Sequence, residues 1–180
     1  MEEIAISFKK ALESGDLDFV AEVAELIRKS ISHSEQPPLL ELVRTEIVPY
    51  IMELLDPKYY HHEKLMHECS WIMTNIASGR QEYVQYLVDL DILPKALNLF
   101  SHPSIEVKEN AVWILSNIAG EESSFRDKLI ERDIVKHIEN LLSGCDKNVE
   151  ESFLIQVAWL IADLVRAPTP KFELVTTFLI

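Results

Sequence analysis

The chain has 180 residues, and with 48% hydrophobic side chains it is long enough to bury a continuous core in one array or domain. The 30 acidic and 17 basic residues give a net charge of −13, which argues against a nucleic-acid partner and favours a basic one. No apolar run is long enough to cross a membrane, and the acidic start MEEIAISFKK is unlike a signal peptide.

The sequence predicts helices throughout, because apolar residues recur at helical spacing and prolines stand mostly between the apolar runs. A first helix should end at Ser14-Gly15, and Asp16 is a good N-cap for a second that continues to about Ile31. Pro37-Pro38 breaks the chain and begins a brief helix. The run EIVPYIMELLD follows, and a longer helix is expected over Lys58–Gly79.

The next two cycles repeat this order of short, medium and long helices. The expected helices are 80–91, 92–100 and 105–120, then 122–133, 134–144 and 148–167.

A tryptophan and an asparagine mark the long helix of successive cycles. Trp71 and Asn75 lie four residues apart, as do Trp113 and Asn117, and this spacing puts both side chains on one face of a helix. The second pair follows the first after 42 residues, and Trp159 comes 46 residues later with Asp163 in the asparagine position. Periods of about 40–47 residues are typical of helical repeat arrays, and units of three helices favour the armadillo type.

The predicted fold is therefore all-α, a right-handed superhelical solenoid of three-helix armadillo repeats. One array should fill the chain, with about four repeats. Their expected boundaries are 1–36 for a partial first repeat, 37–79, 80–120 and 121–167, with 168–180 as the start of a truncated fifth.

Particular motifs resemble the armadillo core of importin-α (karyopherin-α), the adaptor for nuclear localisation signals. They are TNIASG after a tryptophan, AVWILSNIAGE, SFRDKLIERD, and the first-repeat stretch RKSISHSEQPPLLELVRTEIVPYIMELL. The resemblance covers nearly the whole chain but includes no basic importin-β-binding segment, so a fragment or a shortened relative is expected. It implies the cytoplasm and nucleus as location. Importin-β would be a partner only if such a segment exists outside this chain.

Indoles exposed along the concave face would form slots for the aliphatic stems of Lys or Arg side chains in an extended peptide. Asparagine amides can both donate to and accept from its backbone, and carboxylates such as Glu68, Glu109 and Glu121 would attract the basic heads. The predicted peptide-binding residues are Trp71, Asn75, Gly79, Asn110, Trp113, Asn117, Glu121, Gln156, Trp159, Asp163 and Ser32.

Some of these roles are implied only by the resemblance. Gly79 and Glu121 match positions that contact the most selective lysine of a signal, Asn110 and Gln156 match polar groove positions, and Ser32 with His33 matches the far end of the site. Three departures stand out. Glu121 replaces an aspartate, Asp163 replaces an asparagine and can only accept hydrogen bonds when ionised, and Val84 replaces a small hydroxyl residue.

Other classes of function find little support in the sequence. His61, His62, His67 and Cys69 do not have the spacing of a closed zinc site, so neither a metal nor a cofactor is expected. No nucleophile elbow, phosphate loop or acid/base carboxylate pair indicates an enzyme. An armadillo scaffold with another peptide partner or without import function stays open as the alternative. The apolar tail KFELVTTFLI is expected to self-associate or to pack back on the array.

Overall fold

The computed structural model describes residues 1–32, 37–145 and 149–166, and every regular element within these ranges is a helix. The helices are α1 (Glu2–Ser14), α2 (Leu17–Ser32), α3 (Leu39–Arg44), α4 (Val48–Glu53), the 3-10 helix η1 (Pro57–Tyr59), α5 (Glu63–Ala77), α6 (Gln81–Asp89), α7 (Ile92–Leu99), α8 (Ile105–Glu121), α9 (Ser123–Ile130), α10 (Ile134–Ser143) and α11 (Glu151–Val165). None of the described helices is both long and apolar enough to cross a bilayer.

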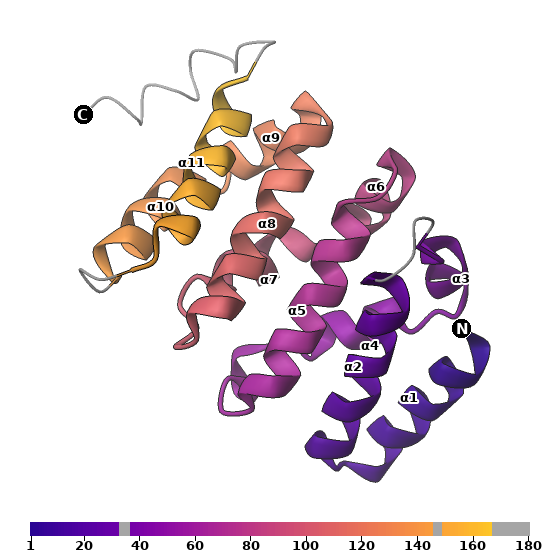
Figure 1. Cartoon of the computed structure of the whole chain (residues 1–180). Coiled ribbons are helices and arrows are strands. Elements are labelled where there is room, and N and C mark those ends of the chain that lie inside the picture. Colours follow the sequence, from indigo (N-terminus) through magenta and orange to yellow (C-terminus); the bar gives the residue numbers. More distant parts are fainter. Residues whose placement is uncertain (33–36, 146–148, 167–180) are drawn as a thin grey trace.

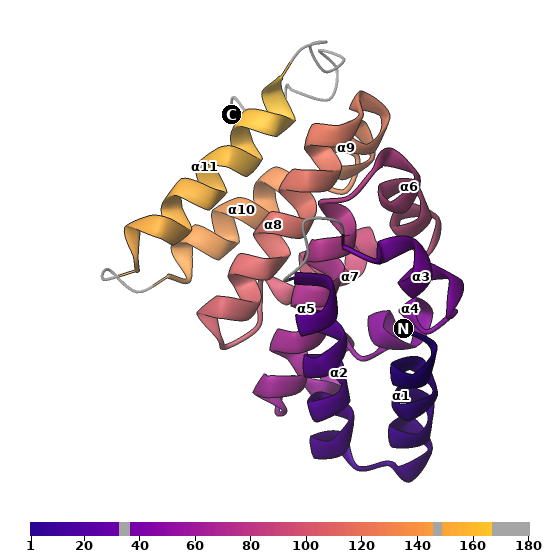
Figure 2. The same cartoon turned by 45° about the vertical axis from the view of Figure 1, so that its right-hand side comes forward.

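The four long helices α2, α5, α8 and α11 lie side by side in one row (Figure 1). α2 packs on α5, α5 on α8 and α8 on α11, so residues one repeat apart in the sequence become neighbours in space. The shorter helices α3, α4 and α6 lie together on one side of this row, as the turned view shows (Figure 2). The order of short, medium and long helices after α2 positions equivalent residues of α5, α8 and α11 along one face.

Local chemistry sets the sharp reversals between helices. Gly15 ends α1 in the left-handed conformation at φ 71°, which costs glycine little. Asp16 then caps α2, since its carboxylate accepts from the backbone N–H groups of Asp18 and Phe19 at 3.0 and 3.2 Å. Asp91 and Asp133 take the same left-handed conformation immediately before α7 and α10, so the two cycles turn at equivalent points.

The helix expected from Lys58 begins later than the sequence indicates. Pro57–Tyr59 form η1, and α5 begins at Glu63 because His62 caps it, its Nδ1 accepting from the backbone N–H of Leu65 at 3.2 Å. One continuous core then runs through the array, with Phe8, Phe125 and Phe153 among its fully buried side chains.

The last described helix keeps an exposed apolar face. Leu154, Ile155, Ile161 and Val165 on α11 are all exposed. The predictions of a fifth repeat over 168–180 and of self-association through its apolar tail fall outside the described residues.

Candidate peptide-binding face

The three tryptophans come from equivalent positions on α5, α8 and α11. Trp113 and Trp159 are 51% and 65% exposed, values that are high for the largest apolar side chain, whereas Trp71 is half-buried. Asn75, Asn117 and Asp163 each follow one helical turn later and are partly exposed. We call the surface that carries these three pairs the groove face.

A pocket of about 290 Å³ lies between Trp71 and Trp113 on the groove face. Its lining residues are His67, Trp71, Glu106, Glu109, Asn110, Trp113 and Gln156. Two of its buried polar atoms, His67 Nδ1 and Gln156 Oε1, have no hydrogen-bond partner in the described structure. A carbonyl oxygen such as Gln156 Oε1 needs a donor, and Lys and Arg heads carry several.

Two acidic residues, Glu106 and Glu109, line this Trp71–Trp113 pocket. Burial raises the pKa of the Glu109 carboxyl, and the charges of Glu150 and Glu106 raise it further. The ionised carboxylate is therefore partly desolvated and is repelled by its acidic neighbours. A cationic side chain entering the pocket would relieve both effects, which makes the pocket suited to Lys or Arg.

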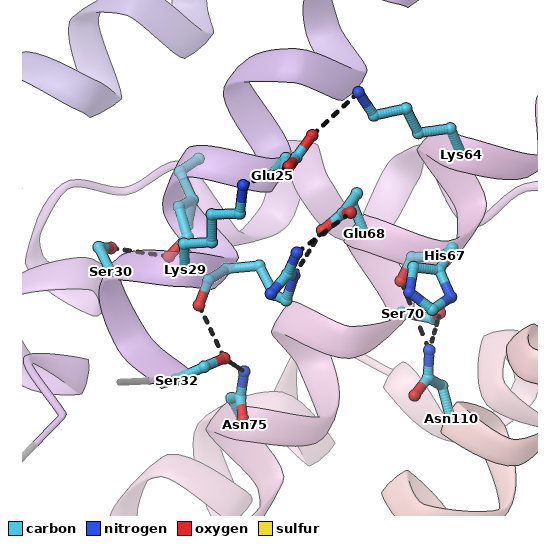
Figure 3. Close-up of polar contacts among 12 residues, drawn as sticks. Glu25, Lys29, Ser30, Ser32, Lys64, His67, Glu68, Ser70, Asn75 and Asn110 are labelled. Carbon is cyan, nitrogen blue, oxygen red and sulfur yellow. Dashed lines mark hydrogen bonds and ion pairs between the residues drawn. The ribbon is translucent and has the colours of Figure 1, made fainter. Parts of the chain in front are cut away.

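The predicted asparagines differ in what their amides already bind. Asn75 Nδ2 donates to Ser32 Oγ at 3.0 Å, so the structure joins two predicted site residues, as Figure 3 shows. Asn110 Nδ2 donates to Ser70 Oγ at 3.0 Å and links α8 to α5. The side chain of Asn117 makes no hydrogen bond to a described residue, so its donor and acceptor are available to a peptide backbone.

Asp163 is engaged on both carboxylate oxygens. Oδ2 accepts from Ser116 Oγ at 2.7 Å, and Oδ1 lies 3.5 Å from Nη2 of Arg166, which also donates to the Gly120 carbonyl. Asp163, Arg166 and Gly120 border a second depression of about 350 Å³, which also includes Glu121, the last residue of α8. The sequence favours a peptide-facing Asp163, whereas the structure adds Arg166, a cation that the sequence did not single out.

Gly79 and Val84 have structural reasons for their identity. A Cβ at Gly79 would lie 2.7 Å from Tyr83 Cδ2 and 2.8 Å from Leu39 Cδ1, so a larger residue would have to displace these two side chains. Val84 is fully buried in the core. Its side chain therefore faces away from solvent at the position where the resemblance implies a hydroxyl near a lysine.

Trp71 already carries a cation from its own chain. The Arg28 guanidinium carbon lies 4.6 Å from the centroid of the Trp71 ring, and its Nε pairs with Glu68 Oε2 at 2.7 Å. The Glu68 side chain points to α2 in Figure 3. The sequence proposed Glu68 as a carboxylate for a ligand, but in the structure it is buried and paired with Arg28.

The histidines and Cys69 do not assemble into a site. His62 Nε2 lies 3.1 Å from Asp18 Oδ1, and Cys69 is buried in the core. No group of three potential metal ligands occurs among the residues that the structure describes. A larger depression of about 760 Å³ between α1 and α3 contains none of the predicted site residues.

Comparisons with known proteins agree with the repeat pattern. The family model for the Armadillo/beta-catenin-like repeat matches residues 80–120. Among curated relatives, Importin subunit alpha-3 of Arabidopsis thaliana is 34% identical over 161 residues, which are 89% of this chain and 29% of that protein. Importin subunit alpha of Saccharomyces cerevisiae is 31% identical over 98 residues, 54% of this chain and 18% of that protein. The chain thus spans less than a third of the length of these relatives.

Solved structures show the same fold. A designed armadillo repeat protein in complex with peptide (KR)4 aligns with a TM-score of 0.73 at 24% identity, covering 90% of this chain and 63% of that chain. A computationally designed armadillo repeat protein for modular peptide recognition aligns with a TM-score of 0.76 at 20% identity, covering 98% of this chain and 76% of that chain. The all-α armadillo fold predicted from the repeats is confirmed.

Proposed function

This chain is an armadillo-repeat protein related to importin-α, and on that premise we propose that it binds basic nuclear localisation signal peptides in extended form along the groove face. In this proposal the chain acts as an adaptor for nuclear protein import, and it is present in the cytoplasm and nucleus. Importin-β belongs to this proposal only if a basic importin-β-binding segment exists outside this chain.

The observation that carries the proposal is the pair of exposed indoles on neighbouring long helices. Trp113 and Trp159 leave half or more of their surface in water, although the molecule has ample core in which to bury them. Exposed aromatic side chains beside carboxylates are suited to the apolar stems and charged heads of Lys and Arg.

Each group on the face then has a task in binding. A basic stem lies between Trp71 and Trp113, and its head donates to Gln156 Oε1 and to the carboxylates of Glu106 and Glu109. The amide of Asn117 holds the peptide backbone through a donor and an acceptor. Glu121, at the end of α8, attracts a further basic head.

A fluorescence polarisation titration tests the proposal. The probe is Ala-Ala-Lys-Lys-Arg-Lys-Ala-Ala carrying a fluorophore, and the control replaces all four basic residues by Glu. We expect micromolar or tighter binding of the basic peptide, weakening with added salt because partly exposed charges are screened. Equal binding of both peptides, or binding of neither, contradicts the proposal.

One observation favours a second function, that of a scaffold for a peptide of mixed charge. Arg166 is exposed beside Glu121 and pairs with Asp163, so this end of the face carries both signs of charge. A peptide with an acidic residue at one end of its basic run would complement it. Tighter binding of such a peptide than of the purely basic probe would support the scaffold function.

A further inference from the structure

The row of tryptophan–asparagine pairs has a fourth member that lacks both residue types. Arg28 precedes Trp71 by 43 residues, and Ser32 precedes Asn75 by the same interval. Both lie on α2, the long helix that packs against α5. Arg28 and Ser32 therefore occupy the positions that tryptophan and asparagine hold on α5 and α8.

Arg28 and Ser32 contact Trp71 and Asn75, the next pair along the row, at the groups that a peptide would otherwise bind. Arg28 stacks on the Trp71 ring at 4.6 Å, and its guanidinium pairs with Glu68 through contacts of 2.7 and 3.4 Å. Ser32 Oγ accepts from the Asn75 amide, and it donates to the Arg28 carbonyl at 2.8 Å. Helix α2 thus binds the Trp71 indole, the Glu68 carboxylate and the Asn75 amide, the same groups that a basic residue of a peptide would bind.

We propose that Arg28 is a built-in basic side chain that closes the amino-terminal end of the groove face at Trp71. This inference rests on the proposed function and fixes how many basic residues of a peptide are recognised. The peptide's basic side chains then lie between Trp71 and Trp113 and beyond, towards α11. A basic residue added to the peptide at the Trp71 end of this run cannot bind Trp71 and Glu68, because Arg28 already occupies both.

Arg28 occupies both the Trp71 ring and the Glu68 carboxylate at this end of the groove face. The Arg28 and Glu68 side chains are only 13% and 7% exposed, so the pair is largely withdrawn from water. A second cation can reach this end only by displacing Arg28 from both the ring and the carboxylate. Removing the Arg28 side chain leaves an indole face and an unpaired carboxylate, which is the chemistry of a further slot for Lys or Arg.

The test compares the core probe Ala-Ala-Lys-Lys-Arg-Lys-Ala-Ala with two probes of equal length in which one flanking Ala becomes Lys, at either end. In the unmodified chain the added Lys should change Kd less than threefold. In Arg28→Ala, one of the two extended probes should bind roughly tenfold more tightly than the core probe, the size of effect expected for a partly desolvated cation–π contact.

Two further variants identify the source of that gain. Arg28→Ala combined with Glu68→Gln should lose most of it, because the slot then lacks its carboxylate. Lys64→Ala removes one positive charge from α5, where Lys64 pairs with Glu25, and should give no gain. Equal gains in all three variants, or no gain in Arg28→Ala, would overturn the inference while leaving binding of the core probe intact.

A measurement without peptide separates this inference from the proposed function. In a chain with Trp113→Phe and Trp159→Phe, Trp71 is the only indole left. Adding Arg28→Ala should at least double the rate constant for acrylamide quenching of its fluorescence. Unchanged quenching would show that Arg28 does not cover Trp71, whatever the chain binds. Circular dichroism melts confirm that each variant is folded.

Discussion

Replacing Trp113 by alanine should weaken binding of the basic probe strongly and leave the fold nearly unchanged. Trp113 is 51% exposed on the middle long helix of the groove face. A tryptophan side chain buries roughly 150–250 Å², so on the order of 100 Å² of it remains for a ligand to cover. At roughly 25 cal/mol per Å², covering that surface contributes about 2.5 kcal/mol at most.

A cation over the ring adds about 0.5–1 kcal/mol, and incomplete coverage offsets part of the sum. Truncation of Trp113 should therefore cost about 1–3 kcal/mol, which is roughly a 5- to 150-fold rise in Kd. The melting temperature should change little, because half of the indole is in water and alanine is a good helix former.

Isothermal titration calorimetry with the basic probe gives the affinity, and a thermal melt gives the stability. The matched control is Tyr50→Ala on α4, an aromatic residue of similar exposure at 49%. Tyr50→Ala should leave Kd within a factor of two. Unchanged affinity in Trp113→Ala, or an equal loss in both variants, would refute the assignment of the groove face.

Two substitutions and one labelling experiment probe the same surface and the core. Glu109→Gln should raise the melting temperature at pH 7, because the raised pKa of Glu109 means that its ionisation destabilises the folded chain. The same substitution should weaken binding of the basic probe. A fall in both melting temperature and affinity would contradict the raised pKa. Asp163→Asn should weaken binding of the basic probe roughly two- to fivefold, because it removes a negative charge and leaves the positive Arg166 without its carboxylate. Tighter binding in calorimetry would instead indicate that residue 163 faces the peptide backbone. Half-buried Cys145 should react with a thiol reagent in the native chain, whereas Cys69 should not, because burial shields its thiol and raises its pKa. Mass spectrometry identifies the labelled cysteine, and early labelling of Cys69 would contradict this prediction.

The fold was predictable because its signals are local or periodic. The order of residues alone shows the helical spacing of apolar residues, the turn at Gly15 and Asp16, and the repeat period that separates Trp71 from Trp113. Exposure of Trp113 and Trp159 follows from the same period, since equivalent helices present equivalent faces. The beginning of α5 was missed because a histidine cap replaced the usual hydroxyl or carboxylate.

The contacts between repeats were not predictable from these signals. Arg28 with Trp71, Ser116 with Asp163, and the burial of Val84 depend on how one repeat is placed on the next. A signal for Arg28 did exist, since it stands one period before Trp71, but only the structure shows that a cation in that position folds onto the ring.

A crystal structure of the chain with the core peptide Ala-Ala-Lys-Lys-Arg-Lys-Ala-Ala tests the central claim most directly. We expect an extended peptide along α5, α8 and α11, with a basic side chain between Trp71 and Trp113, its backbone bound by Asn117, and Arg28 still on Trp71. A peptide bound in another conformation, or in the depression between α1 and α3, would contradict the account.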